Sequence, residues 1–277
     1  IELAKKLVRI MSKERATDFK DWRRVGYALY AVDESLYDSF IEFSKKNMKK
    51  YRDNKVPCKQ IWDSASQYAK FYSIGSIRHW AKIDNQSEYY RIISETMGEL
   101  FLKAESSRHV DIANVVKELY KDRFVCVDMV KNKWYEFQEN RWVLIQSAYT
   151  LAELISDEVR KMMFGYLSTK MDQARKEDNI GGDSVYKRYA KAMQTVDKLA
   201  DIPFRKNILE ACASKFYDST FQKNLDSNIY LIGFNNGVWD LKEHCFRNGL
   251  PTDYVCKTVG YDYKEFKSTD PVFARIN

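Results

Sequence analysis

A run of basic residues is the part of this 277-residue sequence with the clearest chemistry. Within residues 43–59, Asp53 is the single acid beside seven lysines and arginines. These are Lys45, Lys46, Lys49, Lys50, Arg52, Lys55 and Lys59. Clustered cations neutralise phosphates and release counterions, which gives salt-dependent binding without sequence preference. The run therefore predicts a surface that binds nucleic acid, and a solvated helix face is the alternative.

Aromatic residues accompany and follow the basic run. They are Tyr51, Trp62, Tyr68, Phe71, Tyr72 and Trp80. Aromatic rings can stack on the bases of a single strand. Most of these residues recur at the spacing of a helix core, so we expect them to pack inside the protein. Tyr72 stands beside a predicted turn at residues 73–76 and is the aromatic candidate for base stacking.

Motifs that carry catalysis are missing from the sequence. It has no G-x-x-x-x-G-K-[ST] phosphate loop, no G-x-G-x-x-G, no G-x-S-x-G elbow, and only three histidines. We therefore expect no catalytic residue and no cofactor in this chain.

Two groups of residues have the types that bind metal ions. His244, Cys245 and Cys256 come closest to a zinc cluster, but zinc sites use closely spaced ligand pairs. Asp240 and Asp253 are candidates for the carboxylate pair of a metal-dependent nuclease. A strand end and a turn after proline explain these two aspartates without a catalytic role. We therefore expect no metal site.

The net charge of +7 is concentrated near the start of the chain. Residues 1–88 hold 18 Lys and Arg against 12 Asp and Glu, a net charge of +6. This uneven charge indicates that the N-terminal part binds a polyanion. Five scattered cysteines without a C-x-x-C pair indicate a reducing, intracellular compartment. The longest uncharged stretch has 13 residues, too few for the roughly 20 that cross a membrane, so no membrane partner is expected.

The elements expected around the basic run are short helices. Thr17 or Asp18 is placed to cap a helix, and a second helix from Ser35 carries its apolar stripe through Phe40 and on to Tyr51. On that second helix the lysines form two rows opposite the stripe. A third helix begins at Pro57, and a fourth follows residues 73–76. Together these helices predict a compact module that presents its cations outward.

Beyond this module, helices alternate with short β-type runs. Residues 124–127, 134–137 and 141–144 predict antiparallel hairpins, and helical patterning covers most of 149–217. Three more runs follow at 229–234, 237–241 and 245–247. The residues Asn235, Asn236 and Gly237 predict a turn with positive φ. The fold class is α+β, mostly α, with a helical module at 1–87 and a larger helical domain with small antiparallel sheets at 88–277.

Two sets of motifs resemble a known family. The first set is Asp21-Trp22-x-x-Val25-Gly26-x-Ala28-Leu29, Phe43-Ser44-x-Lys46, Trp62 and Ser73-Ile74-Gly75-Ser76-Ile77-x-x-Trp80-Ala81-Lys82. It resembles the primase C-terminal domain of viral and plasmid primase–helicases. The second set is Leu119-Tyr120-x-Asp122-Arg123-Phe124, Trp134-Tyr135-x-Phe137, Arg141-Trp142, Phe234-Asn235-Asn236-Gly237-Val238-Trp239-Asp240-Leu241, Phe246-Arg247 and Pro251-x-Asp253-Tyr254. It is similar to the domain preceding the superfamily III helicase in poxvirus-type primase–helicases of nucleocytoplasmic large DNA viruses.

The resemblance implies a middle region of such a protein. Its relatives carry a primase upstream and, downstream, an ATPase that uses ATP and Mg²⁺, assembles as a hexamer and unwinds DNA. We expect this chain to be a non-catalytic piece that binds single-stranded DNA or a primer–template, organises the helicase ring and links primase to motor. Its expected partners are DNA, further copies of itself and viral replication proteins, at a replication site in the host cytoplasm or nucleus.

Two other functions stay open. The chain could be a protein–protein interaction or oligomerisation module without direct DNA binding. It could also be a metal-dependent nuclease, although its acids are scattered.

Overall fold

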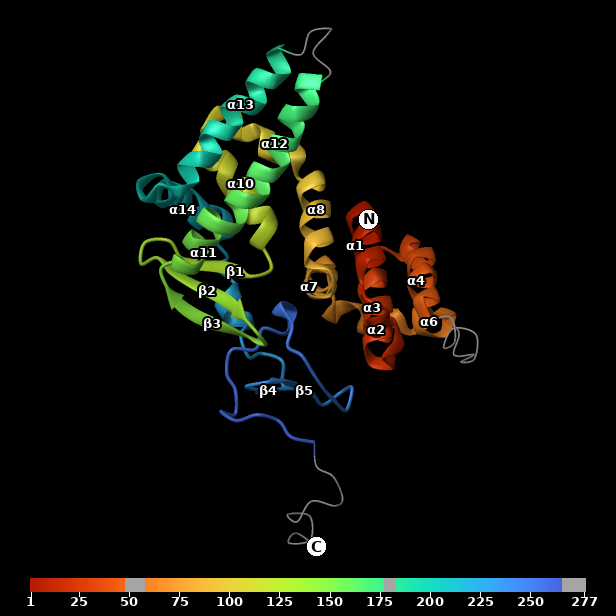
Figure 1. Ribbon diagram of the computed structural model, residues 1–277. Coiled ribbons are helices and arrows are strands. Elements are labelled where there is room, and N and C mark those ends of the chain that lie inside the picture. The colour runs from red at the N-terminus through yellow and green to blue at the C-terminus, as the bar shows by residue number, and fades with distance from the viewer. Residues whose placement is uncertain (48–57, 177–182, 266–277) are drawn as a thin grey trace, which may run out of the picture.

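The computed structural model describes residues 1–47, 58–176 and 183–265 of the chain. Within these residues the protein is mostly helical and carries two small antiparallel sheets (Figure 1). This confirms the predicted class, α+β and mostly α. None of the described helices is both long and apolar enough to span a bilayer.

The N-terminal third is a bundle of short helices. They are α1 (Glu2–Ile10), α2 (Lys13–Thr17), α3 (Phe19–Val32), α4 (Tyr37–Ser44), α6 (Cys58–Tyr68), α7 (Ile74–Asp84) and α8 (Gln86–Thr96). The Asp18 side chain caps α3 by accepting a hydrogen bond from the Asp21 backbone at 2.9 Å. Ser73 caps α7, and Ser76 completes a capping box. These two helix starts lie where the sequence predicts them.

The first sheet follows two more helices. Helices α9 (Gly98–Leu102) and α10 (His109–Tyr120) lead into β1 (Phe124–Asp128), β2 (Lys133–Gln138) and β3 (Arg141–Gln146). The strands form an antiparallel meander in the order β1-β2-β3, as predicted. Next come α11 (Tyr149–Leu154), a π-helical turn (Ile155–Val159), α12 (Arg160–Lys176), α13 (Asp183–Asp197), α14 (Ile202–Phe216) and α15 (Phe221–Asn224).

The second sheet lies in the C-terminal part of the described chain. It consists of β4 (Leu231–Phe234), β5 (Gly237–Asp240) and β6 (Cys245–Arg247), paired in that order and antiparallel. In Figure 1 it lies at the opposite end of the molecule from the α12–α13 hairpin. All three predicted runs thus form strands.

The turn between β4 and β5 differs from the predicted one. No residue from Asn235 to Gly237 has a positive φ. The Asn236 carboxamide instead bonds both ways with the Tyr263 backbone, at 3.0 and 2.9 Å. Glycine is needed at Gly237 because a Cβ there would lie 2.6 Å from the Arg247 carbonyl oxygen. The asparagine therefore anchors a neighbouring segment, and the glycine permits close strand packing.

One cluster of buried apolar residues extends from α1 to α14. Helix α8, which contains the predicted boundary between residues 87 and 88, packs against α1 and α12. Polar contacts add to this packing: Arg78 bonds to Glu118, and the Thr252 hydroxyl donates to the Phe71 carbonyl at 2.9 Å. The division of the chain at this boundary stays a prediction.

Candidate nucleic-acid interface

The first part of the basic run lies where α4 ends. Helix α4 stops at Ser44, and Lys45–Asn47 form a 3₁₀ turn. The buried Ser44 hydroxyl donates to the Phe40 carbonyl at 2.7 Å and accepts from the Trp22 indole at 2.8 Å. Tightening into a 3₁₀ turn is common at helix ends. The predicted single helix that carries two rows of lysines is therefore wrong at this point.

Lys45 and Lys46 have different surroundings. Lys45 is exposed and makes no ion pair within the described residues. The Lys46 ammonium group donates to the Arg9 carbonyl at 2.7 Å and to the Met11 carbonyl, which lie at the end of α1. Burial lowers the pKa of Lys46. Lys46 thus stabilises the C-terminus of α1, as cations at helix ends do, and is not a freely exposed charge.

The other predicted cations divide into two groups. Lys59 lies in the first turn of α6, where it forms an exposed ion pair with Asp63 at 3.0 Å. Four others fall outside the described residues: Lys49, Lys50, Arg52 and Lys55. Residues 48–57 carry four cations and one acid, which is half of the +6 net charge of residues 1–88.

Tyr72 packs against the helical core. Its ring centroid lies 6.2 Å from that of Tyr27 and 6.1 Å from that of Trp80. Burial raises the pKa of the Tyr72 hydroxyl. The side chain is half-buried rather than fully exposed, so these contacts occupy much of the ring, and base stacking by Tyr72 stays a prediction.

Exposed lysines of α2 and of the start of α3 were missed in the sequence, and α2 lies beside the 3₁₀ turn. Helix α2 packs against the turn, and the Asn47 carboxamide donates to the Thr17 hydroxyl at 3.2 Å. Lys13, at the start of α2, and Lys20, in the first turn of α3, are both exposed. They stand more than twenty residues before the basic run, so a search for local charge does not find them.

Asp84 joins the start of α2 to the end of α7. Its carboxylate accepts hydrogen bonds from the Ser12 backbone at 2.9 Å and from the Arg15 guanidinium at 2.8 and 2.7 Å. Burial acts to raise the pKa of Asp84, but the bonds from Arg15 and Ser12 outweigh it and hold the pKa below the usual value. Ionised Asp84 therefore stabilises the folded protein.

Asp84→Asn is expected to lower the free energy of unfolding by about 1–2 kcal/mol at pH 7. Because the folded-state pKa is lowered, the stabilisation is present above the usual pKa of an aspartate and is lost as the pH falls through the folded-state pKa. Urea denaturation at pH 7 and pH 3 tests this, with Asp63→Asn as an exposed control. An equal loss for Asp84→Asn at both pH values would contradict it.

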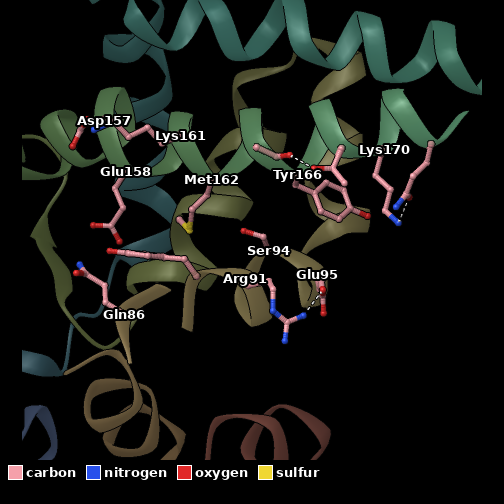
Figure 2. Close-up of a pocket in the computed structure, with 14 residues that line it drawn as sticks. Gln86, Arg91, Ser94, Glu95, Asp157, Glu158, Lys161, Met162, Tyr166 and Lys170 are labelled. Carbon is pink, nitrogen blue, oxygen red and sulfur yellow. Dashed lines mark hydrogen bonds and ion pairs between the residues drawn. The ribbon is translucent and has the colours of Figure 1, made fainter. Parts of the chain in front are cut away.

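A groove of about 790 Å³ runs between α8 and α12 (Figure 2). Two of its cations pair with acids of their own helical segments: Arg91 bonds to Glu88 and Glu95, and Lys161 to Asp157. Figure 2 shows Met162 of α12 pointing into the groove toward α8. Lys170, which also lines the groove, bonds to the neutral Gln173 side chain at 3.1 Å and is the lining cation without an acidic partner among the described residues.

The two aspartates considered for a nuclease face the same arginine. The Arg247 guanidinium bonds to Asp253 at 2.7 and 2.8 Å and to Asp240 at 3.2 Å, and all three side chains are buried. Both carboxylates are thus bonded to the same buried guanidinium. Nowhere in residues 1–47, 58–176 and 183–265 do three His, Cys, Asp or Glu side chains meet in a way that could hold a metal ion.

Comparison with known families defines the class of protein. Residues 4–81 match the family model described as Primase C terminal 2 (PriCT-2), and residues 113–276 match the model described as D5 N terminal like. The two matches follow one another in the order that the sequence motifs predict. The class is that of a region related to primase–helicases. The chain belongs to the D5 N-terminal-like family, and the resemblance found in the sequence is confirmed.

Similar proteins come from large DNA viruses. The chain is 32% identical to a protein of Acanthamoeba polyphaga mimivirus named as a putative helicase, over 99% of this chain and 28% of that protein. It is 25% identical to a protein of Invertebrate iridescent virus 3 with the same kind of name, over 96% of this chain and 32% of that protein. A protein of African swine fever virus named as a putative primase is 25% identical over 86% of this chain and 27% of that protein. The chain thus spans about three-tenths of the length of these relatives.

Proposed function

We propose that this chain is the DNA-binding, non-catalytic middle region of a viral replicative primase–helicase. One observation carries the proposal: a primase C-terminal match and a D5 N-terminal-like match follow one another in one chain, and the first contains most of the excess positive charge. The N-terminal module binds single-stranded DNA or a primer–template. The second part joins neighbouring subunits of a hexamer and passes DNA to a motor outside this chain, where ATP and Mg²⁺ bind.

The contact with DNA is electrostatic and begins at the end of α4. Lys45 is exposed there, and Lys13 lies on the helix that packs against the same turn. The sequence continues from this turn into Lys49, Lys50, Arg52 and Lys55. Each phosphate that such cations neutralise on a single strand contributes about 0.7 to the slope of log affinity against log salt. Binding should therefore weaken steeply as salt increases.

Reversing the charge of Lys45, Lys49 and Lys50 to glutamate is expected to lower the affinity for single-stranded DNA at least tenfold at low salt. The salt slope should fall by up to about 2, since roughly 0.7 is lost for each phosphate contact removed. Lys46 is left unchanged because it holds the carbonyls at the end of α1. Fluorescence anisotropy with a labelled oligonucleotide, measured at several salt concentrations, gives both quantities.

The matched control reverses Lys198, Lys206 and Lys223, three exposed lysines of the second part of the chain. It changes the net charge by the same amount at sites away from the basic run. Equal loss of affinity in both variants would mean that net charge alone attracts DNA. Unchanged binding of the first variant at low salt would remove the basic run from the interface.

An apolar surface favours the alternative of a protein–protein interaction module. Ile229, Tyr230, Ile232 and Leu241 are all exposed around β4 and β5. Patches of this kind commonly mark contacts with other proteins. If the chain shifts no oligonucleotide in a gel while light scattering reports oligomers, this second function replaces the first.

A further inference from the structure

A second cavity lies between the parts of the chain matched by the two families. Its volume is about 590 Å³, within the range of small-molecule sites. Arg78 and Lys82 of α7 line it from one side, together with Tyr89 and Tyr90 of α8. The other side consists of Tyr120 at the end of α10, residues 136–139 around the end of β2, and residues 249–251. Cavities at such junctions are frequent ligand sites.

Two buried donors that line this cavity make no hydrogen bond of ordinary geometry with any described residue. The Tyr120 side chain is 5% exposed and Arg78 is 8% exposed. The terminal nitrogens of Arg78 donate to the Glu118 carbonyl and carboxylate at 2.8 Å, but its Nε has no partner within the described part of the chain. The Tyr120 hydroxyl has none there either. Buried donors are rarely left unpaired because their desolvation is costly, so a missing partner indicates a ligand.

Tyr120 keeps its proton. Burial raises its pKa well above the usual value, and the Glu158 carboxylate adds to this effect by its charge and as a weak acceptor that lies outside ordinary hydrogen-bond geometry. Glu158 accepts a hydrogen bond from Lys82 at 3.1 Å. The phenol is therefore a neutral donor, and it suits a ligand that presents an acceptor.

The charges of the cavity disfavour a phosphate. Its cations are already paired: Arg78 with Glu118, Lys82 with Glu158, and Arg123 with Glu136 at 2.7 Å. Asp122 and Glu139 add further acids to the lining. Burial and the neighbouring cations lower the pKa of His79, so its imidazole is neutral at pH 7. An anion would meet acids that have no compensating free cation.

The remaining walls suit a flat, uncharged ring. The side chains of Tyr89, Tyr90 and Phe137 line the cavity beside the two free donors. Aromatic rings stack on nucleobases, and the carbonyl and ring-nitrogen acceptors of a base match donors such as a phenol and a guanidinium. We propose that this cavity binds a nucleobase, presented by a free nucleoside or by a single DNA strand. The proposal stands apart from DNA binding by the surface lysines.

Tyr120→Phe tests the proposal because it removes only the free hydroxyl. In the absence of ligand the melting temperature should rise by about 2 °C, since an unpaired buried group is removed. Affinity for deoxynucleosides, measured by calorimetry with the whole chain, should fall about tenfold. Tyr135→Phe is the matched control: Tyr135 is 8% exposed but packs against Phe221, away from the cavity, and should leave nucleoside affinity unchanged.

Two ligands distinguish the source of the base. If a strand supplies it, an oligonucleotide binds more tightly than the nucleoside, and Tyr120→Phe weakens both. If free nucleosides are the ligand, the oligonucleotide gains nothing from this site. The variant with Lys45, Lys49 and Lys50 reversed should still bind the nucleoside, which separates this proposal from the proposed DNA surface. No binding of any nucleoside or oligonucleotide at this site, or a lower melting temperature for Tyr120→Phe, would overturn it.

Discussion

Arg247→Ala is expected to lower the free energy of unfolding by about 3–5 kcal/mol. The arginine is the shared partner of two buried carboxylates, which it bonds at 2.7 and 2.8 Å in Asp253 and at 3.2 Å in Asp240. Without the guanidinium, both acids would remain buried with no opposite charge. Removing one partner from a buried ion pair costs far more than losing an exposed one.

The two aspartates that Arg247 bonds, Asp240 and Asp253, also hold the local backbone. Asp240 accepts from the backbone nitrogens of Lys242 and Glu243, and Asp253 accepts from that of Leu250. Arg247→Ala should therefore loosen the second sheet and the segment after it together. Proteolysis of the native protein is expected to become faster within residues 237–255.

Urea denaturation of wild type and Arg247→Ala measures the effect. Arg141→Ala, which removes an exposed arginine of β3, serves as the control and should change stability by less than about 0.5 kcal/mol. Adding Asp253→Asn to Arg247→Ala should recover part of the loss, because it removes one of the two unpaired charges. If Arg247→Ala lowers the free energy of unfolding by less than about 1 kcal/mol, water must reach Asp240 and Asp253.

Gly249→Ala is expected to destabilise the protein by about 2–3 kcal/mol. A Cβ at this position would lie 2.0 Å from the carbonyl oxygen of Asn140 and 2.8 Å from its Cα. These are backbone atoms of the turn between β2 and β3, so no side chain can rotate away to make room. The Gly249 nitrogen also donates to the Asn140 side chain at 2.8 Å, which fixes the two segments at this spacing.

Gly165→Ala provides the opposite result in the same protein. A Cβ on Gly165, in the middle of α12, would meet no atom within 4 Å. Alanine should raise the free energy of unfolding by about 0.5–1 kcal/mol, because it restricts the unfolded chain and favours a helix. Thermal denaturation of both variants checks the pair. Similar effects at the two positions would mean that the contact with Asn140 is relaxed by backbone movement.

Local patterns predicted the elements of this fold well. The caps at Asp18 and Ser73 and the strands around Trp134 and Trp239 follow from short-range chemistry, because a cap needs one polar side chain and a strand needs a few β-forming residues. The end of α4 at Ser44 was missed. The bond between Ser44 and the Trp22 indole joins residues from different helices, and a local pattern does not contain it.

The candidate sites also have some features that the sequence shows and others that only the fold shows. The basic run and its location in the chain are visible in the residue types, since charge is a property of each side chain. The different surroundings of Lys45 and Lys46 are not, because Lys46 meets carbonyls of Arg9 and Met11 that lie more than thirty positions earlier. The sequence motif that contains Tyr120 likewise gave no sign that its buried hydroxyl makes no ordinary hydrogen bond with the described residues.

Residue types and spacing were sufficient to establish the family, the fold class, the order of the elements and the uneven charge. These depend on interactions within a few positions of the chain and on motif order. Which acids neutralise Arg247, which glycine touches another backbone, and which donors face a cavity depended on the folded arrangement. Each of those facts joins segments distant in sequence, and packing brings them together through burial and geometry that a linear pattern does not encode.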